Sequence, residues 1–383
     1  MNICIDIAAA VQQTAGIGRY TAKLAEHLLK LDAENDYSFF YNDSGRLAVP
    51  NFAQGHPIHT VRLGNKSWRF ALLLAHRLGL SMDRRLASVD VFHATDVIYP
   101  LLKKASVVAT IHDLSFLLFP AFHALPNRLN LRMALPLVAR RAKMLIAVSE
   151  NTKRDVERIL KISGEKVRVV PLGADGCFQP VAQDMARDRL AKRYCIEGPF
   201  VLHTGTLEPR KNIGTLIEAF ATLKARGDLP HKLVIAGKKG WLYQPLFDLV
   251  KSKGLEHEVI FPGFVDDRDL PSLYSAADVF VFPSFYEGFG LPPLEAMACG
   301  APVVCSGASS LPEVVGDAAI LFDPRDVHAL TAAMSRVLTD ETLRRGLSAQ
   351  GLARAKRFTW ERTAVSTLDV YQECYNCSSI CGI

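Results

Sequence analysis

The feature that most constrains the fold is a repeated alternation of short apolar runs with longer amphipathic stretches. Near-continuous apolar runs of roughly four to six residues are typical of parallel strands that helices cover on both faces. The alternation occurs in both halves of the chain, which predicts an α/β protein with two doubly wound domains. The predicted strands are Ile3–Ile7, Tyr37–Tyr41, Val89–His93, Val107–Ile111, Leu145–Val148 and Val167–Val170, followed by Phe200–Thr204, Lys232–Ala236, Val259–Phe261, Val279–Phe282, Val303–Cys305 and Ala319–Phe322.

The 383 residues are enough for two domains of ordinary size. Glycines, prolines and a polar run mark a seam near residues 173–198. We therefore expect an N-terminal Rossmann-like domain over residues 1–178 and a C-terminal one over residues 179–359. A last helix, at about residues 360–378, follows the second set of strands and is expected to pack back on the first domain. Two such domains leave a cleft between them, so the loops that follow strands are the ones expected to carry chemistry.

Composition and charge limit the classes of function. Residues 1–180 contain 23 Lys and Arg against 15 Asp and Glu, whereas residues 181–383 contain 22 against 24. The excess in the first half fits an anionic partner or, equally, a mildly basic solvated surface. No signal peptide is recognisable, and the most apolar stretch, Leu114–Asn127, is too short to span a membrane. A cytoplasmic protein is expected.

Eight cysteines are scattered through the chain, mostly in apolar runs, as in a reduced cytoplasmic protein. Cys374, Cys377 and Cys381 have a spacing that resembles metal ligands, but no fourth ligand is close in the sequence. We therefore expect a thiol-bearing tail rather than a metal site.

Two loops of the first half could carry chemistry. Gly16 and Gly18 precede an amphipathic helix, where backbone N–H groups and the helix dipole favour an anion. Thr21 replaces the third glycine of a dinucleotide-binding loop, and Asp43 is poorly placed for a ribose, so NAD binding is not expected. His112 ends a predicted strand, where α/β enzymes place reactive groups; a core histidine bonded to backbone is the alternative reading.

In the second half, a strand is followed by Gly205, Thr206 and then the adjacent cations Arg210 and Lys211. The forked guanidinium and the ammonium are suited to a diphosphate, although a solvated surface pair would read the same.

The next such loop is the segment EGFGLPPLE, residues 287–295. Its two glycines and two prolines predict an anion-accepting turn that opens a helix. Glu295 would lie in the first helical turns. A carboxylate so close to phosphate-binding N–H groups is expected to accept hydrogen bonds from ribose or sugar hydroxyls.

These residues resemble the retaining glycosyltransferases of family 4, which have the two-Rossmann GT-B fold. The resemblance spans nearly the whole chain, and its most specific part is the E-x7-E signature from Glu287 to Glu295. The segments GTLEPRKN, VVPLGAD and SLPEVVGDAAILFDP fit the same family.

The resemblance implies roles for the residues at matching positions. Arg210 and Lys211 would hold the donor diphosphate, Glu295 the nucleotide ribose, and Glu287 the transferred sugar. His112 would lie near the sugar, which makes His112, Glu287, Arg210 and Lys211 the expected catalytic set. The remaining donor-binding residues would be Gly16, Gly18, Gly205, Thr206, Gly237, Lys238, Gly263, Phe264, Val265, Phe289, Gly290 and Leu291.

The family's chemistry requires no cofactor and no metal. The leaving nucleoside diphosphate would be neutralised by Arg210, Lys211 and helix N-termini, and the acceptor would lose its proton to the departing phosphate. Asp267 and Asp269 form a D-x-D, the metal motif of another transferase fold, but they precede a predicted helix and are expected to cap it.

Three further segments, GIGRYT, HATD and TIHDLSF, look most like bacterial mannosyltransferases of surface polysaccharide synthesis. GDP-mannose is therefore the leading donor, with UDP- or dTDP-linked sugars as alternatives, and a glycan or lipid-linked glycan is the expected acceptor. A non-catalytic sugar-nucleotide-binding protein and an epimerase are rival readings. Nucleic-acid binding is not expected, because no recognised module is present.

Two basic stretches of the first half could lie on anionic lipid. Lys66, Arg69 and Arg77 form a stripe beside apolar rows in residues 66–78, and residues 121–143 mix Leu and Phe with five cations. Peripheral contact with the inner face of the plasma membrane is one expectation, and ordinary core helices with solvated basic edges are the other.

Overall fold

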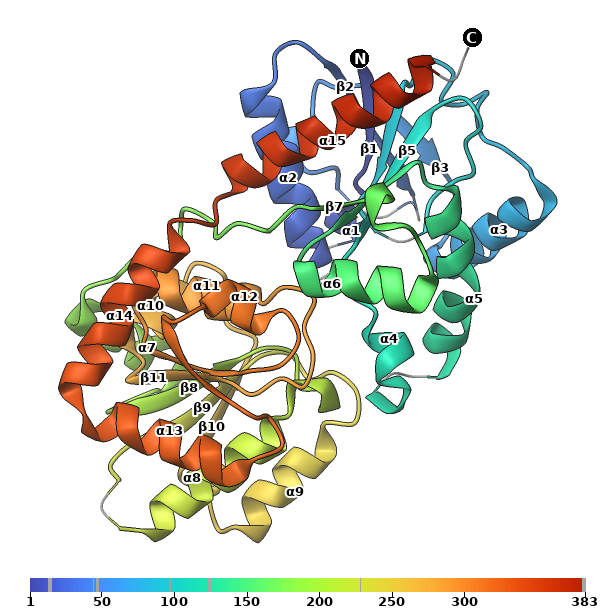
Figure 1. Cartoon of the computed structure of the whole chain (residues 1–383). Coiled ribbons are helices and arrows are strands. Elements are labelled where there is room, and N and C mark those ends of the chain that lie inside the picture. The colour runs from blue at the N-terminus through green and yellow to red at the C-terminus, as the bar shows by residue number, and fades with distance from the viewer. Residues whose placement is uncertain are drawn as a thin grey trace. The chain divides into compact units, whose positions relative to one another are not determined.

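The computed structural model describes residues 1–12, 16–43, 45, 48–96, 98–122, 125–227 and 229–380, without the side chains of residues 125–131, 133 and 378–380. It divides into two compact units (Figure 1). Unit 1 comprises Met1–Gly173 and Trp360–Ile383, and unit 2 comprises Ala174–Thr359. Cys381 of the cysteine-bearing tail lies outside the described residues, and the other seven cysteines are free thiols.

Unit 1 is built on a parallel sheet with the strand order β3-β2-β1-β4-β5-β6-β7. Its strands are β1 (Asn2–Asp6), β2 (Asp36–Asn42), β3 (Ile58–Val61), β4 (Val91–Ala94), β5 (Ser106–Ile111), β6 (Met144–Ala147) and β7 (Val167–Val169). Its α-helices are α1 (Ala8–Val11), α2 (Ile17–Leu31), α3 (Asn65–Leu78), α4 (Ser115–Leu118), α5 (Leu125–Arg141), α6 (Glu150–Asp155) and α15 (Trp360–Ile380).

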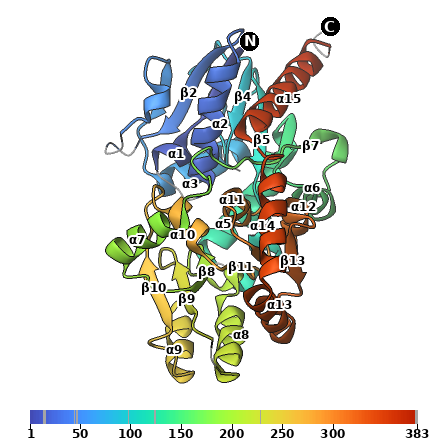
Figure 2. The ribbon, with the colours of Figure 1, turned by 90° about the vertical axis from the view of Figure 1, so that its left-hand side faces the viewer.

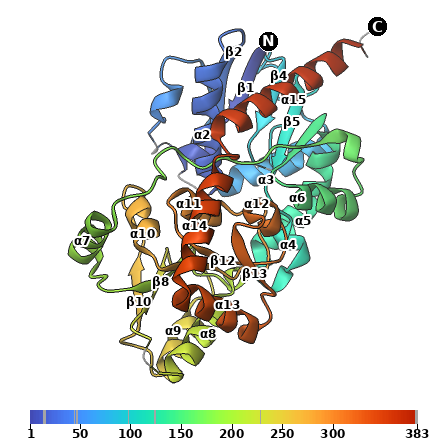
Figure 3. The same cartoon turned by 60° about the vertical axis from the view of Figure 1, so that its left-hand side comes forward.

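Helices cover both faces of this sheet, as its nearly all-apolar strands require. On one face, Trp68 and Leu72 of α3 and Leu135 and Val138 of α5 pack in one core with inward residues of the strands. On the other face α2 and α15 lie side by side (Figures 1 and 3). Both layers leave the carboxyl ends of the strands to the loops.

Unit 2 repeats the plan with the parallel order β10-β9-β8-β11-β12-β13 (Figure 2). Its strands are β8 (Phe200–Thr204), β9 (Lys232–Ala236), β10 (Val259–Gly263), β11 (Val279–Phe282), β12 (Val303–Ser306) and β13 (Ala319–Phe322). Its α-helices are α7 (Gln183–Tyr194), α8 (Ile213–Ala225), α9 (Gln244–Ser252), α10 (Leu270–Ala276), α11 (Leu291–Ala298), α12 (Leu311–Val315), α13 (Val327–Thr339) and α14 (Glu341–Ala355).

The prediction of two doubly wound α/β domains is confirmed, and every predicted strand overlaps an observed one. The sequence reading missed β3 at the edge of the first sheet. Its residues Ile58–Val61 alternate between exposed and half-buried, because an edge strand is covered less completely than a central one. The pattern of a fully buried strand is therefore absent there.

Helix α15 is fixed to unit 1 by a chain of buried polar groups. The hydroxyl of Tyr371 lies 2.6 Å from Nδ1 of His93, whose Nε2 lies 2.8 Å from the hydroxyl of Thr110. Thr110 in turn lies 2.9 Å from the hydroxyl of Tyr20 on α2. Burial lowers the pKa of His93 to about 3, so the ring is neutral and needs one donor and one acceptor.

No helix among the described residues is long and apolar enough to cross a membrane. The longest described helix, α15, has 21 residues and carries charged and polar side chains along its length.

Replacing Tyr371 with Phe tests this docking of α15. The change removes the hydroxyl beside Nδ1 of His93 and leaves a buried ring nitrogen without its partner, so we expect unit 1 to lose about 1–3 kcal/mol of unfolding free energy. Denaturant titration followed by tryptophan fluorescence measures this, because Trp68 and Trp360 both belong to unit 1. As a control on the same helix, Val365→Ala shortens a half-exposed side chain and should change stability by less than about 0.5 kcal/mol. Equal unfolding midpoints for the two variants would contradict the docking role.

Candidate functional site

The candidate site of unit 2 lies where the strand order reverses direction. The chain runs from β8 outward through β9 to β10 and then returns to β11 on the other side of β8. Open parallel sheets bind ligands outside the carboxyl ends of strands at such a switch point. The loops after β8 and β11 contain, respectively, the Arg210–Lys211 pair and the Glu287–Glu295 segment.

Three glycines bring the ends of β8, β9 and β10 together. The Gly205 N–H donates to Ala236 O at 2.9 Å, and the Gly237 N–H donates to Gly263 O at 2.8 Å. A Cβ on Gly237 would lie 1.9 Å from the carbonyl oxygen of Gly205, so only glycine fits this approach. Thr206 follows Gly205 directly, so these predicted donor-binding residues lie together at the carboxyl ends of the strands.

Two more of the predicted donor-binding loops follow β9 and β10. Lys238 places its ammonium 4.5 Å from the ring centroid of Phe264, which is more than half exposed, whereas Val265 is buried. An exposed ring beside a cation at a strand end can stack with a planar base.

Arg210 and Lys211 lie on a short 3-10 turn, Pro209–Lys211, that is held against the loop after β11. The turn ends at Asn212, whose left-handed backbone (φ 55°) directs its amide to the carbonyls of Pro283 and Pro324, at 3.1 and 2.7 Å. The N–H of Phe285 donates to Arg210 O at 3.0 Å. These bonds fix both cations next to Glu287.

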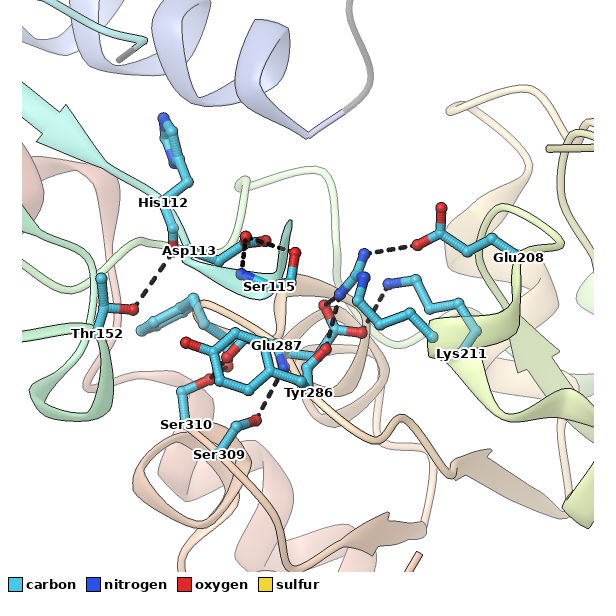
Figure 4. A network of polar contacts seen from close by, with 12 residues as sticks. His112, Asp113, Ser115, Thr152, Glu208, Lys211, Tyr286, Glu287, Ser309 and Ser310 are labelled. Atoms are coloured by element: carbon cyan, nitrogen blue, oxygen red, sulfur yellow. Dashed lines mark hydrogen bonds and ion pairs between the residues drawn. The ribbon is translucent and has the colours of Figure 1, made fainter. Parts of the chain in front are cut away.

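The side chains form a buried ion cluster (Figure 4). One carboxylate oxygen of Glu287 accepts from the Lys211 ammonium at 2.7 Å, and the other accepts from Arg210 at 2.8 Å. The same guanidinium donates to Glu208 at 2.7 Å and to the carbonyl of Tyr286 at 2.7 Å. Two cations and two carboxylates thus compensate one another away from water.

The cluster sets the protonation state of Glu287. Burial alone would raise the pKa of its carboxyl, but Arg210 and Lys211 outweigh burial and lower it to about 2. Glu287 is therefore a carboxylate at any physiological pH and has no proton to donate. The contact uses one of the three N–H groups of the Lys211 ammonium, so the cation can still face a second anion.

Glu295 has a different environment. It lies on α11, which begins after Gly290, a residue with φ 116° whose Cβ would come within 2.7 Å of Leu311. The Glu295 carboxylate is buried and accepts from the hydroxyl of Tyr274 at 3.1 Å. Tyr274 lies 2.9 Å from the hydroxyl of Thr204 at the end of β8. Glu295 is therefore held among hydroxyl groups.

Two serines that the sequence reading did not select hold the loop of Glu287. The Glu287 N–H donates to the hydroxyl of Ser309 at 2.8 Å. The hydroxyl of Ser310, fully buried, lies 2.9 and 2.8 Å from the carbonyl oxygens of Glu287 and Phe289, which share its one hydrogen as acceptors (Figure 4). Glu208 and Tyr274 were also missed. Glu208 and Ser310 lie in segments that fit the family, GTLEPRKN and SLPEVVGDAAILFDP, but no role was assigned to either. Ser309 and Ser310 meet the Glu287 loop across more than 20 residues of chain, and Tyr274 meets Glu295 across 21, which no local pattern shows.

In unit 1, the loops after β1, β4 and β5 meet at the corresponding switch point between β1 and β4. Gly16 caps α2 with φ 64°, and Gly18 is buried in its first turn. Residues 13–15, just before, lie outside the described part of the chain. His112, after β5, donates through Nε2 to the carbonyl of Thr95 at 2.8 Å and lies edge-on to Tyr20.

The His112 ring is neutral in this setting. Burial is the main cause that lowers its pKa, and the hydrogen bond to Thr95 and the nearby carboxylates oppose it only in part. Because Nε2 donates, Nδ1 is the acceptor. Asp113 beside it accepts from both the N–H and the hydroxyl of Ser115, at 2.9 and 2.7 Å (Figure 4).

The expectation that Asp269 caps a helix with its side chain is wrong. Asp269 occupies the N-cap position of α10, but its side chain makes no capping bond. It is fully buried and instead bonds Tyr194 at 2.7 Å and forms ion pairs with Arg189 and Arg193 of α7. A buried carboxylate favours cations over backbone donors, and the sequence does not show that α7 supplies them. Within the described residues, no three His, Cys, Asp or Glu side chains form a group that could hold a metal ion.

Comparison with known proteins assigns both units. The family model "Glycosyltransferase Family 4" matches residues 14–175, and "Glycosyl transferases group 1" matches residues 192–354. The O-antigen chain mannosyltransferase B of Escherichia coli is 34% identical over 366 residues, which is 93% of this chain and 96% of that protein. The serotype-specific mannosyltransferase WbdA of the same species is 37% identical over 227 residues, 58% of this chain but only 28% of that protein.

Solved structures share the fold. Sucrose-phosphate synthase from Thermosynechococcus elongatus superposes with a TM-score of 0.80 at 23% identity, covering 98% of this chain and 100% of that one. WaaG, a glycosyltransferase involved in lipopolysaccharide biosynthesis, gives a TM-score of 0.71 at 15% identity, covering 97% and 99%.

The resemblance expected from the sequence is thus confirmed across nearly the full length of a relative. The chain belongs to the family 4 glycosyltransferases, has their GT-B fold of two Rossmann-like domains, and is a glycosyltransferase.

Proposed function

We propose that the enzyme transfers mannose from GDP-mannose, with retention of configuration, to a glycan or lipid-linked glycan. The ion cluster of Glu287, Lys211 and Arg210 at the β8–β11 switch point carries this proposal, because it provides two fixed cations where a leaving diphosphate would gain charge. The choice of mannose is supported by the two Escherichia coli relatives, which are both mannosyltransferases by name.

The chain's own cations would stabilise the departing GDP, so the reaction is proposed to need no metal. Lys211 has N–H groups beyond the one that bonds Glu287, and Arg210 is oriented by Glu208 and by the carbonyl of Tyr286. Preorganised donors of this kind stabilise developing charge without reorganisation during the reaction. Backbone N–H groups of Phe289, Gly290 and Leu291, at the start of α11, would add to them.

Glu287 does not fit the role of general base. A carboxylate with a pKa of about 2 binds a proton too weakly to take one efficiently from a sugar hydroxyl near neutral pH. The departing phosphate is the better acceptor for that proton. Glu287 would orient the two cations and contact the sugar hydroxyls, and Glu295 would accept hydrogen bonds from the ribose.

A different nucleotide sugar is the alternative donor. Anabaena HepE, whose fold matches with a TM-score of 0.72 at 19% identity, has been solved in complex with UDP and glucose. At that identity the likeness concerns the fold, and the loops at Lys238 and Phe264 would decide which base is accepted.

We also propose that the enzyme works at the cytoplasmic face of the plasma membrane, with basic helices of unit 1 against anionic lipid. The excess of Lys and Arg in residues 1–180 supports this, since cations near such a surface each contribute about 1 kcal/mol.

A donor panel tests the choice of substrate. We expect nucleotide release from GDP-mannose, in the presence of a glycan acceptor mimic, to exceed release from UDP- and dTDP-sugars by at least about tenfold in kcat/KM. Release of GDP is measured by coupled assay, and the product's anomeric configuration by NMR. Turnover of a UDP-sugar with GDP-mannose ignored would replace the donor assignment, and an inverted product would remove retention.

Replacing Lys211 tests the diphosphate role. In the wild type, the Lys211 ammonium lies 5.2 Å from the centre of the Phe282 ring. Lys211→Met keeps an apolar side chain at this position but removes the charge. We expect kcat/KM for the donor to fall by roughly 100- to 1,000-fold, the loss typical of one missing oxyanion donor. Lys192→Met, on the exposed surface of α7, is the control and should stay within about twofold of the wild type. Near-normal turnover of a folded Lys211→Met protein would remove the assignment.

A further inference from the structure

Helix α3 carries a second apolar face that the fold does not bury. Trp68 and Leu72 pack into the core of unit 1, and His76 bonds the carbonyl of Tyr99 at 2.9 Å, so one side of the helix is anchored. On the opposite side Phe70, Leu74 and Leu78 follow one another at intervals of four residues. Their exposed fractions are 68, 45 and 63%, and Leu80, just beyond the helix, is 58% exposed. Four large apolar side chains thus form one exposed row, which we call the α3 row.

Exposed apolar residues are ordinary when scattered, but a contiguous row marks a contact surface. In the part of α5 whose side chains the structure describes, Leu135 and Val138 are buried in the core, whereas Arg132 and Arg140 are exposed. The described side chains thus place an exposed apolar face, which a membrane surface would require, on α3.

The charge around the row selects its partner. Residues 44–82 contain no Asp or Glu, whereas Lys66 and Arg77 flank the row on α3 and are exposed. Arg69 differs from the expected basic stripe, because it turns to Asp96 at 3.7 Å. A second copy of the chain would bring cations against cations across a symmetric interface, which is unfavourable. An anionic bilayer surface matches both the apolar row and its charge.

We propose that the α3 row inserts into the headgroup region of an anionic lipid bilayer, with Lys66 and Arg77 at the level of the lipid phosphates. This inference rests on the membrane contact proposed above and assigns it to α3. The vesicle experiment tests that contact separately from the transferase activity.

Vesicle flotation of the full chain tests the surface. Vesicles of phosphatidylethanolamine with and without phosphatidylglycerol are used, and Phe70→Gln/Leu78→Gln is compared with the wild type. Both side chains are exposed, so the variant should fold, and we expect its partitioning onto the anionic vesicles to fall by about tenfold or more. Met185→Gln, on α7, removes a 66% exposed apolar side chain elsewhere and should bind like the wild type.

Three outcomes would overturn the proposal. The first is equal binding of the double variant and the wild type, and the second is no binding of the wild type to either kind of vesicle. The third is a wild-type dimer that forms without lipid and that the double variant does not form. The last outcome, seen by sedimentation, would assign the row to a second copy. Nucleotide release with a water-soluble acceptor is measured on the same proteins. Failure of that activity in the wild type counts against the proposed function and leaves the vesicle result standing.

A separate observation concerns Ser310. Its hydroxyl holds the carbonyls of both Glu287 and Phe289, at 2.9 and 2.8 Å. The C=O and N–H of a trans peptide point in opposite directions, so the contact with the Phe289 carbonyl turns the N–H of Gly290 away from Ser310. Ser309 meanwhile takes the N–H of Glu287 and adopts a left-handed backbone, φ 55°, which is unusual for serine.

We infer that Ser310 is a positioning residue that aims the N–H groups of the Glu287 loop towards the donor. This inference rests on the proposed donor site. Ser310→Ala would let both carbonyls rotate, and we expect kcat to fall by roughly 100-fold with a smaller change in KM, because the misplaced donors act on charge that develops in the transition state. Ser310→Thr keeps the hydroxyl and should recover at least a tenth of the activity.

A purely structural role would give a different pattern. Thr331→Val removes a buried hydroxyl from α13 of the same unit and serves as the control, with kcat unchanged. A Ser310→Ala protein with lowered melting temperature but normal kcat would overturn the inference. Loss of activity in Ser310→Ala and Ser310→Thr alike, with donor binding intact, would also count against it. If the wild type itself fails to bind any nucleotide sugar, the donor site fails instead.

Discussion

The buried contact between Glu287 and the pair Arg210–Lys211 is the interaction on which the rest of unit 2 depends. It joins the loop after β8 to the loop after β11, two segments more than 70 residues apart in the chain. Charges removed from water are tolerated only when paired and hydrogen-bonded, and here each carboxylate oxygen of Glu287 has its own cation. Loss of Glu287 would leave Lys211 and Arg210 adjacent without the carboxylate that bonds both of them. The cluster therefore fixes both the positions of the two loops and the charges at the site, so a change in one alters the other.

The cluster can form because the sheet topology brings these loops together. In both units the chain leaves the central strand in one direction and later returns on its other side, so two strand ends remain adjacent while their helices diverge. Unit 1 has Gly16, Thr95 and His112 in the loops at the corresponding position, where His112 donates to the carbonyl of Thr95 and lies edge-on to Tyr20. Unit 2 has its ion cluster there. The same parallel frame thus supports a hydrogen-bonded histidine in one unit and a buried ion cluster in the other.

The sequence predicted what depends on local pattern. Buried strands have continuous apolar runs, so β8, β9 and β11 were placed at their observed bounds, whereas the half-exposed edge strand β3 was missed. Gly205 and Gly290 were selected as residues at turns, and their positive φ angles agree with that reason. Partners across long separations were not predictable. Ser310 meets Glu287 through a loop 23 residues away, and Asp269 meets Arg189 from 80 residues away, so the expected helix cap became an ion pair.

The two carboxylates of the E-x7-E segment show how environment separates the roles of identical groups. Glu287 faces two cations and keeps its charge to a pKa of about 2, so it acts as a fixed anion that orients donors. Glu295, eight residues later on α11, accepts from the Tyr274 hydroxyl, which in turn lies beside the hydroxyl of Thr204. A carboxylate beside hydroxyl groups can accept hydrogen bonds from a neutral, polar ligand. A carboxylate bonded to two cations instead holds those cations in place for a neighbouring diphosphate. Eight residues separate the two carboxylates. Over this distance the chain passes from Glu287, in the ion cluster, past the N-terminus of α11 to Glu295, beside the Tyr274 hydroxyl.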